Sequence, residues 1–191
     1  AGSTSLGSTH NVFIGLDAGG GTWADAASSY NVTVGNYTMN NALNGAVYNV
    51  AMGYGALSST TSADSNVAIG YLAGNSITTG GSNVIIGDQA GDAINTGYNN
   101  TIMGKSAGTN LTTGLNNVII GRVAAYASTD VDKTVIIGEQ AAYSGNMTSA
   151  ADGTVSIGAN AGKNVTSAAA SAFVGFGAGA SVTTGDNNSF F

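Results

Sequence analysis

The sequence contains no cysteine and no proline, and only 7% of its 191 residues are charged. Without cysteine, the chain forms neither a disulfide framework nor a thiolate metal site. A typical globular domain carries about 25% charged residues. Asparagine, serine, threonine and glycine must therefore supply most of the polar surface, which is unusual for an ordinary globular domain.

Basic charge and long apolar runs are also scarce. The net charge is −6, and the only four basic residues, Lys105, Arg122, Lys133 and Lys163, have acidic residues near them. Because nucleic acids are bound through basic patches, we expect no nucleic-acid partner. No apolar run approaches the roughly 20 residues that span a bilayer, so this segment is not expected to insert into a membrane.

The residues that usually carry chemistry occur here without partners. His10 is the only histidine and precedes the repeats described below, which indicates an exposed terminal residue. Asp17, Asp25 and Asp64 lie in no Asp-x-Asp-Gly loop of the kind that binds Ca²⁺. Gly19–Gly21 is not followed by Lys-Ser/Thr, so it indicates a flexible corner and not a phosphate loop. We predict that the protein is not an enzyme and has no catalytic residue, cofactor or metal.

The chain is an array of repeats anchored on a glycine that follows a Val-x-Ile pattern. Successive anchors are 20, 18, 17, 17, 17, 17, 17, 20 and 17 residues apart. One dominant period over the whole chain predicts a single repeat architecture and no second domain. The ten anchors are Gly15, Gly35, Gly53, Gly70, Gly87, Gly104, Gly121, Gly138, Gly158 and Gly175.

Alignment on the anchors shows what each column requires. Asparagine stands four residues before the glycine in the first seven copies, and valine usually follows it. The residue just before the glycine is always β-branched or methionine, and the third residue after it is alanine in every copy except one, where Thr38 stands. The seventh residue after the glycine is Ile77, Ile94, Leu111, Val165 or Val182 in the regular copies, and a Thr-Gly turn such as Thr79-Gly80 follows in several of them.

These columns predict one turn of a β-solenoid in each copy. The valine and the β-branched residue are two apart, so they face the same way, and we expect that face to be the core. The residue between them faces the other side and varies freely. The anchor glycine makes a corner, the alanine fits inside a tight bend, and the Ile/Leu column begins a second short strand. Each coil pairs with the next at about 4.8 Å.

Two further expectations follow from the stacking of columns. Ile85, Ile102, Ile119 and Ile136 occupy the column between the valine and the β-branched residue in four successive coils. A strand with two apolar faces is buried on both, and the simplest partner is an identical chain. The column after the anchor has Asp88, Lys105, Arg122 and Glu139, so opposite charges should meet at its first and last steps.

The segment Asn66–Ala73, Asn-Val-Ala-Ile-Gly-Tyr-Leu-Ala, resembles the head repeat of YadA-type trimeric autotransporter adhesins, and related repeats occur in bacteriophage tail fibres. The resemblance covers residues 11–191. It implies a left-handed parallel β-roll, three identical chains about one axis, and a role in surface attachment. The adhesin repeat is shorter than the 17-residue period found here.

A left-handed β-helix acyltransferase is the rival fold, because Ile69–Gly74 fits its hexapeptide pattern. Those coils need three such hexapeptides, about 18 residues, whereas each copy here has only one. The array also contains no histidine of catalytic type. We therefore expect an all-β parallel solenoid of about ten 17-residue coils.

Residues 1–10 are expected to form a partial N-terminal coil, and residues 11–191 a single array that continues beyond position 191. The next anchor would fall at position 192, and Asn188–Phe191 matches the residues that lead into an anchor. We therefore expect an eleventh strand at this point.

Two longer coils hold the candidate ligand contacts. The first contains Trp23 and Tyr30, and the second begins at Tyr143. Insertions in repeat proteins lie on one face, often the binding face, and aromatic rings there can stack on sugars. The alternative is that Trp23 packs over the end of the roll or against a neighbouring chain.

The sequence thus predicts a structural or adhesive segment of an elongated extracellular fibre, on a bacterial surface or a virion. Its partners are expected to be two identical chains and a cell-surface glycan or protein receptor. The alternative function is a free-standing glycan- or ice-binding solenoid, suggested by threonine pairs such as Thr78-Thr79 and Thr112-Thr113. The matching positions of other coils, Asn95 among them, interrupt a Thr-x-Thr ladder.

Overall fold

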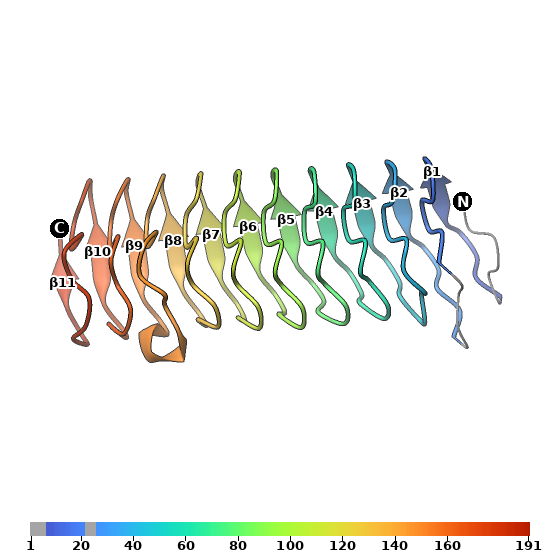
Figure 1. Ribbon diagram of the computed structural model, residues 1–191. Coiled ribbons are helices and arrows are strands. Elements are labelled where there is room, and N and C mark those ends of the chain that lie inside the picture. Colours follow the sequence, from blue (N-terminus) through green and yellow to red (C-terminus); the bar gives the residue numbers. More distant parts are fainter. Residues whose placement is uncertain (1–6, 22–25) are drawn as a thin grey trace.

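The computed structural model describes residues 7–21 and 26–191, and these form a parallel β-solenoid of about ten coils. The coils are stacked in chain order along one axis (Figure 1). Their strands make one parallel sheet in the order β1 to β11. The strands are β1 Val12–Ile14, β2 Val32–Val34, β3 Val50–Met52, β4 Val67–Ile69, β5 Val84–Ile86, β6 Thr101–Met103, β7 Val118–Ile120, β8 Val135–Ile137, β9 Val155–Ile157, β10 Ala172–Val174 and β11 Ser189–Phe190.

Each described coil contains one strand. The prediction of a second strand at the Ile/Leu column is therefore wrong. The rest of the coil consists of turns and bends, with only an isolated bridge between Ser167 and Thr184. Backbone hydrogen bonds still join successive coils there, as in Thr78 N to Asn95 O at 3.1 Å. The corners leave too few extended residues for a second ladder, although the coils stay in register.

The inward face of the sheet is the opposite of the predicted one. The middle residue of each strand points into the coil: Ile85, Ile102, Ile119 and Ile136 are fully buried. The first and third residues, such as Val84 and Ile86, are only partly buried and lie on the outer face. The valine–isoleucine pair was therefore placed on the wrong side. The prediction failed because both columns are apolar, so alternation alone does not say which faces the core.

In several coils the size of the middle strand residue is matched to that of the fourth residue after the anchor. Glycine or alanine stands there where the strand centre is large, as in Phe13 with Gly19 and Ile85 with Gly91. A Cβ on Gly19 would lie 2.9 Å from the Phe13 ring. Where the centre is Ala51, the matching residue is the fully buried Leu57. The matching does not hold in every coil, because the small residues Ala68 and Ser156 also stand with glycines, Gly74 and Gly162.

The other predicted inward columns are confirmed. The alanine three residues after the anchor is buried in the regular coils, and the Ile/Leu column, with Ile77, Ile94 and Leu111, is fully buried. These side chains belong to one continuous hydrophobic core along the solenoid.

The asparagine column forms a buried ladder of side-chain amides. Each Nδ2 donates to the Oδ1 of the asparagine one coil earlier, at 3.0–3.2 Å from Asn31 through Asn117. Each Nδ2 also donates to a backbone carbonyl, such as Asn83 to Gly97 O at 2.9 Å. The row ends at Thr134, whose Oγ1 donates to Asn117 Oδ1 at 2.7 Å. Asparagine suits this position because its amide donates and accepts at once, so each buried amide from Asn31 to Asn117 has partners.

The longer coil before β9 and the last segment of the chain both have regular structure. The longer coil between β8 and β9 contains a short 3-10 helix, η1 Ser149–Ala151, which projects from one side of the array (Figure 1). Asp130 Oδ1 accepts a hydrogen bond from Ser149 N at 3.2 Å, and Met147 is fully buried beneath the loop. The expected eleventh strand is present as β11, paired in parallel with β10.

Candidate functional site: the outer face of the sheet

The outer face of the sheet is the main candidate site. We define it as the first and third residues of strands β1 to β10. Every one of them except Thr101 is apolar: Val12, Ile14, Val32, Val34, Val50, Met52, Val67, Ile69, Val84, Ile86, Thr101, Met103, Val118, Ile120, Val135, Ile137, Val155, Ile157, Ala172 and Val174.

This outer face is partly open to solvent along its whole length. None of its residues is fully buried, and the exposed fraction reaches 58% at Ile14 and 40% at Met52. With strands about 4.8 Å apart, the apolar strip is about 43 Å long. Contiguous exposed apolar surface of this kind marks interaction sites in soluble proteins.

Aromatic residues flank the strands in the first four coils. Tyr30 and Tyr48 stand two residues before β2 and β3, and Tyr54 and Tyr71 stand two residues after β3 and β4. Both pairs stack from coil to coil: ring centroids are 5.1 Å apart for Tyr30–Tyr48 and 5.6 Å apart for Tyr54–Tyr71. Stacking follows from the coil spacing, which is close to the preferred separation of offset rings.

The structure does not bring the predicted ligand contacts together. Trp23 lies outside the described residues. The Tyr30 ring is stacked between His10, at 4.8 Å, and Tyr48, so neither face of this ring is open to a sugar. Tyr143 lies beyond β8, six coils away, and its ring packs against Tyr126 with Lys163 Nζ 6.0 Å from its centroid. Sequence reasoning overlooked the stacked columns, although the spacing of Tyr30 and Tyr48 gave the signal.

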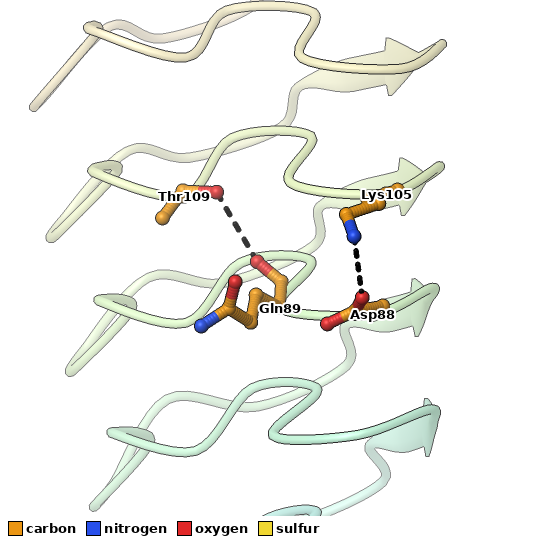
Figure 2. Close-up of polar contacts among 4 residues, drawn as sticks. All are labelled: Asp88, Gln89, Lys105 and Thr109. Atoms are coloured by element: carbon orange, nitrogen blue, oxygen red, sulfur yellow. Dashed lines mark hydrogen bonds and ion pairs between the residues drawn. The ribbon is translucent and has the colours of Figure 1, made fainter.

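The predicted charge ladder is confirmed. Lys105 Nζ lies 3.0 Å from Asp88 Oδ2 one coil away, and Arg122 pairs with Glu139 in the same way. Figure 2 shows the first pair beside a hydrogen bond from Thr109 Oγ1 to the backbone oxygen of Gln89, 3.2 Å long. Both ion pairs are largely exposed, so each contributes at most about 1 kcal/mol.

Asp92 is the one described acid whose titration is clearly perturbed. Partial burial raises the pKa of its carboxyl, and a hydrogen bond from Asn75 opposes the rise. Its Oδ1 has no hydrogen-bond partner. A folded-state pKa above the unfolded value means that the folded chain holds the proton more tightly. The stabilisation of the folded chain by the proton on Asp92 is complete at low pH, and it is lost as the pH rises through the folded-state pKa.

Asp92→Asn should therefore stabilise the protein at neutral pH, because the amide removes the partly desolvated charge. The difference in melting temperature between variant and wild type should shrink as the pH is lowered to about 3, where the wild-type carboxyl is protonated. Thermal melts of both proteins across this range test the prediction. A difference that does not change with pH would contradict it.

In the described part of the chain, no group of three or more acidic or histidine side chains is arranged to hold a metal ion. The same residues include no helix long and apolar enough to cross a membrane. Compared with protein-family models, with curated proteins and with solved structures, the chain has no match.

Proposed function

We propose that this chain is a structural and adhesive segment of an elongated extracellular fibre, built from three identical parallel chains whose outer faces meet about a common axis. The observation that carries the proposal is the continuous apolar outer face. The inner face of the same sheet is already packed within the chain, so the outer face is the surface left for association. A threefold arrangement covers three such strips at once.

The repeat sequence supports the remaining parts of the proposal. The resemblance of Asn66–Ala73 to adhesin head repeats and to phage tail-fibre repeats points to a left-handed roll and to attachment at a cell or virion surface. A rod of stacked coils suits a spacer that presents a receptor-binding surface, for a glycan or a protein, at a distance. In this proposal the chain performs no catalysis.

The mass of the native assembly tests the proposal directly. We expect three times the chain mass of 18.6 kDa in native mass spectrometry. Ile86→Asp places a carboxylate on the partly buried outer face, where association would leave it without a partner. The variant should keep its circular dichroism spectrum but dissociate at least about 100-fold more readily, a change of about 3 kcal/mol.

Gln89→Ser is the matched control, because position 89 lies in the same coil but outside the strand. This variant should remain associated. A monomeric wild type, or equal association of the two variants, would contradict the proposal.

A free-standing ice- or glycan-binding solenoid is the second candidate, and one observation favours it. Ser62, Thr79, Thr96 and Thr113 occupy one column in four successive coils, and all four are exposed. Hydroxyl groups repeated about every 4.8 Å form a regular polar surface. A stable soluble monomer that shapes ice crystals or binds a glycan array would support this candidate over the fibre.

A further inference from the structure

Two exposed tyrosine rings are held face to face by successive coils. The centroids of Tyr30 and Tyr48 are 5.1 Å apart and their planes differ by 11°. The rings remain 48% and 60% exposed. His10 covers the other face of Tyr30, and the column continues after Tyr48 with Ser65. Within this column, each phenol therefore has the other as its one phenolic neighbour.

We propose that Tyr30 and Tyr48 form a modification site, in which one-electron oxidation joins the two side chains as a dityrosine. The co-reactant is hydrogen peroxide acting through a peroxidase. Each phenol gives one electron to the oxidant and its phenolic proton to water, which leaves two phenoxyl radicals. Spin density on the carbons ortho to each oxygen allows a carbon–carbon bond to form between Cε of Tyr30 and Cε of Tyr48.

The coupling balances without any further reagent. The hydrogens on the two bonded carbons move through water to the phenol oxygens, and both rings regain aromaticity. Two electrons and two protons leave the protein in all, and one peroxide molecule takes them up to become two water molecules. The product is the same chain lacking two hydrogen atoms.

Among the tyrosine pairs of the described residues, Tyr30 and Tyr48 have the closest and most nearly parallel rings; the stacked Tyr54 and Tyr71 are 5.6 Å apart with planes that differ by 21°. Pre-positioned partners react far faster than partners that must meet by diffusion. Tyr98 is also exposed, at 44%, but its ring stacks on no aromatic ring among the residues that the structure describes. In a chain without cysteine, the bond would close a loop between coils as a disulfide does. The inference needs only the single-chain fold, so it does not depend on the proposed trimer.

The test is to oxidise the full chain with peroxidase and hydrogen peroxide at two protein concentrations tenfold apart. We expect dityrosine fluorescence, a denatured mass of one chain lacking two hydrogens, and a yield independent of protein concentration. Chymotryptic digestion, which cuts between the two positions at residues such as Tyr37, should release a cross-linked peptide pair containing Tyr30 and Tyr48.

Two variants separate this pair from general oxidation. Tyr48→Phe keeps a stacked ring but has no phenol, so the cross-linked peptide should fall at least about tenfold. Tyr98→Phe should leave its yield within about twofold. The proposal is overturned if no dityrosine forms, if the products are mainly covalent dimers, or if Tyr98 is cross-linked as often as Tyr30.

Discussion

Ile102→Asp is expected to unfold most of the chain. Ile102 is fully buried at the centre of β6, between Ile85 and Ile119 of the neighbouring coils. Removing its side chain alone should cost about 2–5 kcal/mol, and a buried carboxylate without a partner costs several kcal/mol more. The total is comparable with the whole stability of an ordinary domain, about 5–15 kcal/mol. Circular dichroism at rising temperature measures the effect.

Thr113→Asp is the control, since it adds the same charge at an exposed position in the turn that follows β6. Its stability should stay within about 0.5 kcal/mol of wild type. A well-folded Ile102→Asp chain, with the melting temperature of the control, would show that the strand centre does not face the core.

Gly87→Ala is expected to be strongly destabilising, although it adds only one methyl group. Gly87 has a φ of +140°, and a Cβ there would lie 2.6 Å from the backbone oxygen of Gly104 in the next coil. Backbone atoms on both sides must separate to relieve the clash, which breaks the stacking of the coils. We expect a loss of at least about 3 kcal/mol, seen as a melting temperature lower by roughly 6–12 °C.

Gly177→Ala separates the clash from backbone strain. Gly177 also has a positive φ, +66°, but a Cβ there meets nothing within 4 Å. This variant should lose only about 1 kcal/mol, the cost of a left-handed alanine. Equal losses at the two positions would mean that close approach of the coils is not the reason for the anchor glycine.

The sequence was sufficient to predict the solenoid because specific residue types, and not only apolar residues, recur at fixed positions of each repeat. The anchors such as Gly87, the alanine column and the Asp88–Lys105 step each occupy the predicted place in the coil. Alternation of apolar and polar residues could not show which side of the strand faces the core, because Val84, Ile85 and Ile86 are all apolar. Pairs of large and small residues, such as Phe13 with Gly19 and Leu57 with Ala51, were the signal that the strand centre faces the core.

The candidate site was less predictable than the fold. An apolar surface left open for a partner was expected, but on the opposite face of the strand. The tyrosine stacks are not evident from local sequence, because the ring that contacts Tyr30 is that of Tyr48, one coil away. In a solenoid, residues about 17 apart are the ones that touch, so functional residues must be sought along columns.

The asparagine ladder gives the array an electrical direction. Each Nδ2 in the row donates one of its hydrogens to the coil before it, so the amide dipoles have a common component along the axis, as peptide dipoles do in a helix. The Asn11 end of the row therefore carries partial positive charge and the Asn117 end partial negative charge. Lys133 is the only lysine in the column that precedes the ladder, and it stands directly before Thr134, where the row ends. A cation at the negative end of a dipole is a favourable placement, so the two ends of the ladder are electrostatically distinct.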